Sequence, residues 1–272
     1  MSANIKNQIE SVLNGVDIHT IYNILESRDF KKTEMFVKTA SERTIIDILD
    51  YCDLNLKDMI PDILLILKEH RKENCPLILH EAAEKLESII ALKELCRIGF
   101  NVNKRNSDGN TPIHFAVSIE CFDTLSVFID WGGDVNATNN LEETPLHIAA
   151  QLEDWELLRM LIHKEANVNA KNYLGMTPLH LAVIASCNLN MAFLVLHKAD
   201  INAGDNNKRT PLHFAVALNS IEMVYFFIEK NANLYAKDKD GLTPFHYAVK
   251  SDYVDIVEMF IKFNVDISKC EF

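Results

Sequence analysis

A four-residue motif returns every 33 residues along the larger part of the chain, and this period limits the fold more than any other sequence feature. Each copy reads Thr-Pro, then an apolar residue, then His, with an Ala two positions after the His. A fixed internal period of this length is typical of proteins built from stacked structural repeats. The copies follow one another without insertion or deletion and begin at Thr111, Thr144, Thr177, Thr210 and Thr243.

The motif has the residue types that begin a helix. Thr is a good N-cap, because its side chain accepts a hydrogen bond from a first-turn amide, and Pro at the first helical position has no amide proton to leave unpaired. The His can reach back toward the preceding loop, as Glu does in a capping box. Apolar residues at helical spacing follow, such as Leu125, Phe128 and Ile129. Each unit is therefore predicted to be a turn, a first helix, a short break and a second helix, which must stack to cover its apolar faces.

The period, the T-P-L-H-x-A motif and the ending Asp134-Val135-Asn136 resemble the ankyrin repeat. The resemblance covers residues 105–272 as five regular repeats, and a degenerate repeat precedes them at 73–104. In that unit Leu77-Ile78-Leu79-His80 stands one residue out of step, which predicts one extra residue between its helices. The resemblance implies an all-α fold: an ankyrin-repeat solenoid of stacked helix-turn-helix units with hairpin-like loops, preceded by a small helical N-terminal region.

Several loops lack the glycine that ankyrin repeats usually carry. In the turn before Thr, Glu142 and Lys208 replace it, while Gly109, Gly175 and Gly241 keep it. If these backbones stay left-handed, each residue other than glycine destabilises the fold by roughly 1 kcal/mol, and Asn by less. We expect a stable fold with looser loops. The other replacements are Glu165, Lys198, Asn231 and Asn264 after the second helix, where Gly132 is kept, and Glu120, Glu153, Ser186, Asn219 and Asp252 between the helices.

Residues 1–72 do not show the period. Apolar spacing predicts short amphipathic helices over residues 5–13 and 18–25, and further helices around Thr44 to Tyr51 and Lys57 to His70. Pro61 falls in the first turn of the last of these, where it is tolerated. The region is either a helical cap on the first repeat or an independent functional domain, and degenerate ankyrin-like helix pairs fit the pattern from Thr39 onward.

Composition excludes several kinds of protein. The chain has 27 Lys and Arg against 39 Asp and Glu, a formal charge of −12, which disfavours nucleic acids and anionic membrane surfaces as partners. Six scattered cysteines never form C-x-x-C, so a zinc site or disulfide framework is not expected. No apolar run is long enough to span a membrane, and the first twenty residues do not resemble a secretory signal. We therefore expect a cytoplasmic location, with the nucleus also open.

The sequence contains no motif for catalysis, cofactor binding or metal binding. Glycine-rich phosphate loops, nucleophile elbows and kinase signatures are absent. The segment His80-Glu81-Ala82-Ala83-Glu84 misses the zinc motif H-E-x-x-H at its second ligand. The motif histidines form a row, one in each repeat, rather than a cluster. We expect no catalytic residue, no cofactor, no metal site and no enzyme.

Two functions remain open. The resemblance implies an intracellular protein–protein interaction module, an adaptor or scaffold that binds a partner protein through the concave groove of the repeat stack. The alternative is an accessory ankyrin region of a longer enzyme or channel. The last repeat is apolar on more than one face of its second helix, from Val254 to Phe263, and a terminal repeat normally needs a polar outer side. The expectation is that the polypeptide continues or that this end self-associates.

The ankyrin register predicts which side chains line the groove: two at each hairpin tip, the residue before Thr, and two near the end of the first helix. Apolar residues at these positions concentrate in the middle repeats, and we expect them to face solvent. The candidate partner-binding residues are Ile119, Leu141, Glu143, Leu152, Tyr173, Leu174, Met176, Ile184, Arg209 and Leu218.

A modification is also predicted from the resemblance. Ankyrin proteins of the cytosol can be hydroxylated on the Asn of the D-V-N loop, and Asn136, Asn169 and Asn202 occupy matching positions. Asn136 fits best, because Asp134-Val135 precedes it. A structural role, in which these side chains brace the hairpin loop, is compatible with hydroxylation.

Overall fold

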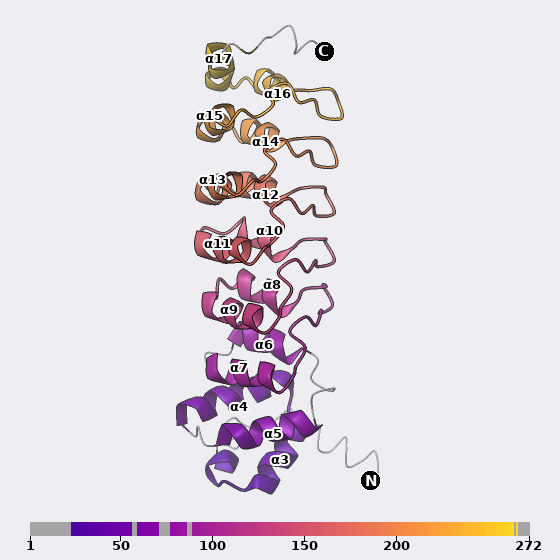
Figure 1. Ribbon diagram of the computed structural model, residues 1–272, viewed down its shortest axis with the longest axis vertical. Helices are drawn as coiled ribbons and strands as arrows, with labels where there is room; N and C mark the ends of the chain where they lie inside the picture. Colours follow the sequence, from indigo (N-terminus) through magenta and orange to yellow (C-terminus); the bar gives the residue numbers. More distant parts are fainter. Residues whose placement is uncertain (1–22, 56–58, 71–76, 86–88, 264, 266–272) are drawn as a thin grey trace. The chain divides into compact units, whose positions relative to one another are not determined.

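The Thr-Pro motif begins a helix in all five regular repeats, as predicted. Each Thr is an N-cap with φ between −92° and −87°, and each Pro takes the first helical position. The computed structural model (Figure 1) describes residues 23–55, 59–70, 77–85, 89–263 and 265. Every regular element within these ranges is a helix, which confirms the all-α prediction. The chain divides into two compact units, Met1–Asp134 and Val135–Phe272.

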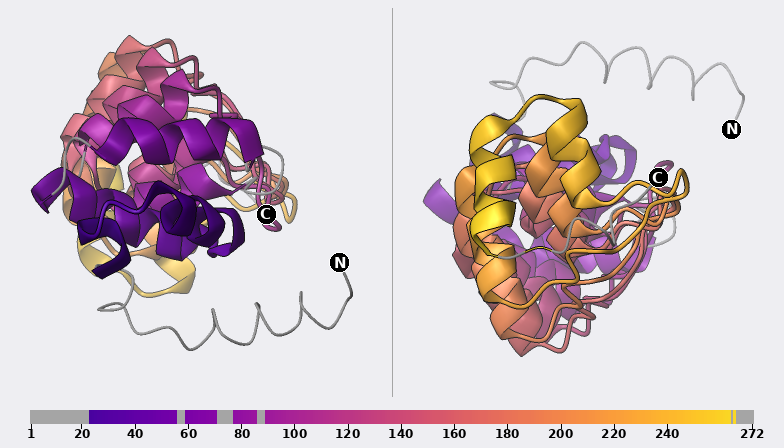
Figure 2. Two further views of the ribbon diagram at one scale, coloured as in Figure 1. Left: turned by 90° about the horizontal axis from the view of Figure 1, so that it is seen from below. Right: turned by 90° about the horizontal axis from the view of Figure 1, so that it is seen from above.

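The second unit contains regular repeats two to five, each a pair of helices. The first helices pack upon one another in one row, and Figure 1 shows the second helices in a parallel row. Figure 2 views this unit from the end of the last repeat and shows the hairpin loops leaving the helices on the same side. The pairs are α10 (Pro145–Ala149) with α11 (Trp155–His163), α12 (Pro178–Ile184) with α13 (Asn188–Leu196), α14 (Pro211–Ala217) with α15 (Ile221–Glu229), and α16 (Pro244–Lys250) with α17 (Val254–Lys262).

The first unit has the same alternation of helices. Helices α4, α6 and α8 pack in one row, and α3, α5, α7 and α9 pack in the other. Helices α4 and α5 pack on α6 and α7 of the degenerate repeat, so the N-terminal region continues both rows. Its role as a helical cap stays a prediction. The helices are α3 (Phe30–Thr39), α4 (Glu42–Asn55), α5 (Ile60–His70), α6 (Ile78–Lys85), α7 (Ile89–Arg97), α8 (Pro112–Ser118) and α9 (Phe122–Asp130).

Helices α4 and α5 confirm the predictions around Thr44–Tyr51 and Lys57–His70, and Pro61 lies in the first turn of α5. Helix α3 was not predicted. It follows the N-cap Asp29, whose carboxylate accepts from the Lys32 amide at 3.2 Å. The helices predicted over residues 5–13 and 18–25 lie outside the described residues except for 23–25, which are helical. The extra residue predicted between α6 and α7 also falls in an undescribed stretch.

The core lies between the two rows and repeats with the same period. The alanine two positions after each motif His is fully buried in all five regular repeats, which lets neighbouring first helices approach closely. One position of every second helix is likewise fully buried and always large. Burying a side chain of this size stabilises the fold by about 1.5–3 kcal/mol, so this position anchors each repeat. It holds Phe128, Leu161, Leu194, Phe227 and Phe260.

The loops keep the left-handed backbone although glycine is missing. Glu142 and Lys208 have φ of 57° and 60°, close to the values at Gly109, Gly175 and Gly241. At Gly175 a side chain is also excluded by space, because a Cβ there would clash with Asn206 of the next repeat. The positions after the second helix and between the helices are left-handed as well. Their residues are Glu165, Lys198 and Asn231, and Glu120, Ser186, Asn219 and Asp252.

Repeat two departs from this pattern at the break between its helices. Helix α10 ends at Ala149, one half-turn earlier than its counterparts, and Glu153 does not adopt a positive φ. The buried amide of Asn190, in α13, donates to the carbonyls of Ala149 at 3.1 Å and Leu152 at 2.6 Å. A side chain of the next repeat therefore satisfies carbonyls at the end of α10.

The left-handed positions give a stability test. Glu165→Gly and Lys198→Gly should each raise the free energy of unfolding by about 1 kcal/mol, because glycine adopts positive φ without steric strain. Urea denaturation monitored by circular dichroism measures the change. Glu153→Gly is the matched control: its backbone is not left-handed, so glycine only loosens the unfolded chain and should not stabilise. Equal gains at all three positions would contradict the explanation.

Candidate interaction surface

Each hairpin tip is built around a buried or half-buried Asn or Asp side chain. In repeat three, Asn172 Oδ1 accepts from the backbone amides of Leu174 at 3.1 Å and Met176 at 3.0 Å. The backbone amide of Asn172 in turn donates to the Met176 carbonyl. The same bonds recur around Asn106, Asn139, Asp205 and Asp238. Sequence reasoning missed these residues, although an Asn or Asp lies five positions before every motif Thr.

Neighbouring tips in the second unit are joined by backbone hydrogen bonds. The Tyr173 amide donates to the Leu141 carbonyl at 3.0 Å, and the Lys239 amide donates to the Asn207 carbonyl at 2.9 Å. Between them, the Asn206 amide donates to the Leu174 carbonyl at 2.9 Å. The four tips of this unit therefore form one connected row rather than separate loops.

The motif histidines connect the tips to the helices. In repeat three, His180 Nδ1 accepts from the Thr177 amide at 3.1 Å and lies 2.9 Å from the Thr177 hydroxyl. Since Nδ1 accepts, the proton is on Nε2, which donates to the Arg209 carbonyl of the next tip at 3.1 Å. His147 and His213 make the equivalent bonds to the carbonyls of Met176 and Leu242. The reach back to the N-cap was predicted, and the bond to the next repeat was not.

Even the degenerate repeat keeps this link within the first unit. His80 Nε2 lies 2.8 Å from the Asn110 carbonyl, the counterpart of the bonds described above. The His80 ring also meets the Phe115 ring edge-on, with centroids 5.4 Å apart, as His180 meets Phe214 at 5.7 Å. His80 therefore keeps the link to the next tip, while its buried Nδ1 has no hydrogen-bond partner among the described residues.

Two tips carry an additional polar contact. The Arg209 guanidinium makes two hydrogen bonds, of 2.9 and 2.8 Å, to Asp205 Oδ2, and it lies over the Phe214 ring. In the next repeat, the Tyr247 hydroxyl donates to Asp238 Oδ2 at 2.8 Å. Burial, together with this bond to a carboxylate, raises the pKa of Tyr247 to about 12. In the first of these two tips, the Asp205 carboxylate largely neutralises the charge of Arg209.

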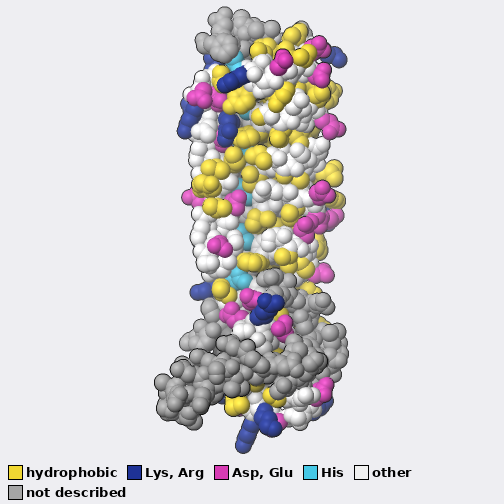
Figure 3. Space-filling view, turned by 180° about the vertical axis from the view of Figure 1, so that it is seen from behind, with side chains coloured by type: hydrophobic (Ala, Val, Ile, Leu, Met, Phe, Trp, Pro, Cys, Tyr) yellow, Lys and Arg dark blue, Asp and Glu magenta, His cyan; other side chains and the backbone are white. Residues whose placement is uncertain are grey.

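In the second unit the structure exposes five apolar groove candidates. Leu141, Tyr173, Leu174, Ile184 and Leu218 each expose between 39% and 51% of their surface. All five belong to the second unit, and Figure 3 shows a face on which hydrophobic side chains gather in its middle repeats. We call Leu141, Tyr173, Leu174 and Ile184 the middle-groove cluster. Ile119, in the first unit, is also exposed, whereas Glu143, Leu152 and Arg209 of the second unit are half-buried.

The predicted exposure of Met176 is wrong, because the residue is only 8% exposed. Its amide is held by Asn172 Oδ1, and its carbonyl accepts from His147 Nε2 at 3.1 Å. These two bonds lie on the inner side of the hairpin and fix the backbone there, and the apolar side chain gains free energy by burial. Met176 is therefore part of the support beneath the tips, not of their outer surface.

The loop asparagines brace consecutive repeats. Asn136 Oδ1 accepts from the Asn167 amide at 2.7 Å, and its Nδ2 donates to the Glu165 carbonyl at 3.2 Å. Asn169 makes the same pair of bonds to Asp200 and Lys198, and Asn202 accepts from the Asn233 amide. The structural role expected of these side chains is confirmed, and their hydroxylation stays a prediction.

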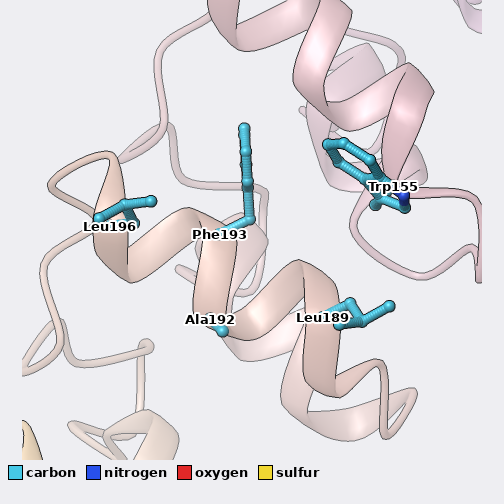
Figure 4. A pocket seen from close by; sticks show the side chains of 5 residues that line it. All are labelled: Trp155, Leu189, Ala192, Phe193 and Leu196. Atoms are coloured by element: carbon cyan, nitrogen blue, oxygen red, sulfur yellow. The ribbon is translucent and has the colours of Figure 1, made fainter.

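A second apolar surface, not predicted from the sequence, lies on the second helices (Figure 4). A cavity of about 330 Å³ is lined by Trp155 of α11 and by Leu189, Ala192, Phe193 and Leu196 of α13. Leu189 and Leu196 are the most exposed of these side chains. The signal was available, since α13 has no charged residue and these four positions follow helical spacing. We call this set the outer-helix patch.

Across the residues that the structure describes, no three or more His, Cys, Asp or Glu side chains are grouped so as to hold a metal ion. Four cysteines in those ranges, Cys52, Cys96, Cys121 and Cys187, are free thiols. None of the helices described is both long and apolar enough to cross a membrane.

The buried histidines predict a loss of stability in weak acid. Burial lowers the pKa of His147 and His213, and it lowers that of His180 to about 4. Between pH 6.5 and 4 the unfolded chain therefore binds protons that the folded chain does not, so stability falls as the pH falls. His180 alone should remove about 2 kcal/mol between pH 7.5 and pH 5.

Urea denaturation at several pH values tests this expectation. His180→Gln should be less stable at pH 7.5 but should lose less stability on acidification than the unmodified protein. Asn207→Gln, at an exposed residue that carries no titratable group, is the control and should leave the pH dependence unchanged. A His180→Gln variant with the original pH dependence would show that other groups cause the loss.

Hydroxylation has a direct test as well. Protein expressed in animal cells should gain the mass of one oxygen atom, located on Asn136 by peptide fragmentation, while Asn136→Ala should not. The Asn136 side chain is exposed, so an enzyme can approach it once its two hydrogen bonds open. An unmodified mass throughout would remove this prediction.

Comparison with known protein families agrees with this geometry. A family model described as ankyrin repeats (3 copies) matches residues 79–172, 120–205 and 179–269. No curated protein matches the sequence. The matched residues include the degenerate repeat from Leu79 onward and most of the five regular repeats, with their paired helices, capped motifs and bonded hairpin tips. The chain belongs to the ankyrin-repeat family.

Proposed function

We propose that this protein is an adaptor or scaffold of the cytoplasm that binds another protein through the groove between its hairpin tips and first helices. Ankyrin repeats are generally protein–protein interaction modules. The observation that carries the proposal is the middle-groove cluster, in which Tyr173 and Leu174 lie on one exposed tip beside Leu141 on the preceding tip. Exposed apolar side chains grouped in this way are typical of interaction sites.

The row of bonded tips supports a binding role for these residues. Tyr173, Leu141 and Leu174 each contribute a backbone group to a hydrogen bond between neighbouring tips. Their side chains are therefore held by a fixed backbone before a partner arrives. A preorganised surface loses less conformational entropy on association, so more of the contact energy appears as affinity.

The histidines favour a structural role over a catalytic one. Both ring nitrogens of His147, His180 and His213 make hydrogen bonds with backbone groups. A general acid or base needs a nitrogen that can exchange a proton with a substrate. We therefore propose that these repeats act by binding and not by catalysis.

Paired substitutions test the location of the site. Tyr173→Ala with Leu174→Ala should weaken partner binding by about 2 kcal/mol or more, roughly 30-fold in Kd, if the cluster is a hot spot. The unfolding midpoint should change little, because both side chains are exposed. Partners are identified by affinity purification and quantitative mass spectrometry from cells of the source organism, and affinities are then measured by titration.

The outer-helix patch supplies the matched control. Leu189→Ala with Leu196→Ala removes exposed apolar surface of similar size from α13 and should leave binding unchanged. Loss of the partner in this control, with full binding by the tip variant, would move the site to the outer helices. If both variants bind the partner fully, the binding site lies outside both surfaces.

A further inference from the structure

The charges along the groove of the second unit are sorted by repeat. At the tip and the end of the first helix, repeat two carries Glu142, Glu143 and Glu153 and no basic residue. At the corresponding positions, and directly before the tip of repeat five, repeats four and five carry four exposed lysines against two exposed aspartates, Asp240 and Asp252. Their other two tip aspartates are buried: Asp205 pairs with Arg209, and Asp238 accepts from the Tyr247 hydroxyl. The four lysines are Lys208, Lys237, Lys239 and Lys250.

Three of these lysines have no partner within the part of the chain that the structure describes. Lys208, Lys239 and Lys250 are exposed, and their ammonium groups make no ion pair or hydrogen bond with any described residue. Arg209 is the contrast, since its charge is matched by Asp205 in the same hairpin. Ammonium groups that the fold leaves unmatched are available to an external anion.

The acidic side chains of repeat two, at the other end of the groove, are unmatched as well. Glu142 and Glu153 are exposed and form no ion pair with the residues described in repeat two or elsewhere. Between the two charged ends lies repeat three, whose tip, Asn172–Met176, carries no charge. The one charged side chain beside that tip, Lys171, donates to the Gly204 carbonyl at 2.8 Å. The middle-groove cluster therefore separates an acidic end from a basic end.

We infer that the partner presents a polypeptide segment with apolar side chains at its centre and Asp or Glu residues at the end that lies over repeats four and five. This inference rests on the proposed function and specifies the chemistry of the partner. The protein as a whole carries a charge of −12, so an acidic segment is repelled by the molecule at long range. Its attraction must come from the local lysines, which makes the basic end a determinant of specificity and orientation.

The apolar centre favours a polypeptide over a nucleic acid. A nucleic acid needs cationic contacts along its backbone, and here the only cation beyond repeat four among the described tip and first-helix positions of this unit is Lys171, while the groove continues as apolar and then acidic surface. A polypeptide can match all three parts of the groove. Its acidic residues then lie over the lysines of repeats four and five, its apolar residues over the middle-groove cluster, and basic or neutral residues over the glutamates of repeat two. The order of its residues therefore fixes its direction along the repeats.

A random-peptide display library selected on the full-length protein tests this. Enriched peptides should combine aromatic or aliphatic residues with a cluster of Asp and Glu on one side. Their affinity should fall as salt rises from about 0.05 M to about 0.5 M, because exposed charges are screened. The triple variant Lys208→Glu, Lys239→Glu and Lys250→Glu should weaken the selected peptides by about tenfold or more.

The control carries the same change of charge on another face. Lys198→Glu, Lys230→Glu and Lys262→Glu lie at the ends of the second helices and should change peptide affinity less than twofold by the same screening argument. Peptides that depend on Tyr173 and Leu174 but are neutral or basic would overturn the inference and leave the proposed function standing. Peptides indifferent to Tyr173→Ala with Leu174→Ala would overturn the proposed function itself. Tighter binding of a single-stranded oligonucleotide than of any peptide would overturn both.

Discussion

The repeat stack depends on a histidine that is shared between two repeats. In repeats two, three and four, Nδ1 of the motif His accepts from the amide that begins its own helix, and Nε2 donates to the last carbonyl of the next hairpin tip. Both bonds require the neutral ring with its proton on Nε2, because a charged ring has no acceptor. One side chain thus sets the start of a helix and the position of the following loop, and its burial keeps the ring uncharged at neutral pH.

Because these buried bonds hold each tip, the side chains on its outer face are not needed to maintain the fold. Leu141, Leu174, Asn207 and Asp240 occupy the same position in successive repeats, and all follow a buried Asn or Asp that holds the turn. The backbone bonds are alike, while the side chains change from apolar to amide to carboxylate. The hydrophobic cluster and the charged ends of the groove can therefore differ between repeats at little expense in folding free energy.

Much of this fold could be predicted because its determinants are local and periodic. Thr-Pro marks each helix start, and positions that normally require glycine stay left-handed with Glu142, Lys208 or Ser186 in place. The predicted register also located the exposed residues Leu141, Tyr173 and Ile184 correctly. Whether any of them touches a partner remains a prediction.

What could not be predicted depends on contacts between repeats. Met176 occupies a groove position, but a bond from His147 of the previous repeat holds its backbone inside the hairpin. Asn190 reaches the carbonyls of repeat two, which changes how α10 ends. Neither contact leaves a mark in the sequence of its own repeat. Helix α3 was missed for a different reason, because its residues, Phe30–Thr39, lie outside the period.

The bonds between neighbouring tips have a consequence for how such a chain can vary in length. An amino acid inserted into the hairpin of repeat three would displace both the Tyr173 amide and the Leu174 carbonyl, and so break contacts with the tips on either side. An insertion in the turn between two helices of one repeat disturbs no such ladder. The sequence agrees: the spacing from Asn103 to Asn136 is the regular period, while His80 and His114 lie one residue farther apart than other motif histidines. The additional residue of the degenerate repeat therefore falls between His80 and Asn103, outside the hairpin tips. Length can be added there without breaking the hydrogen bonds between neighbouring tips.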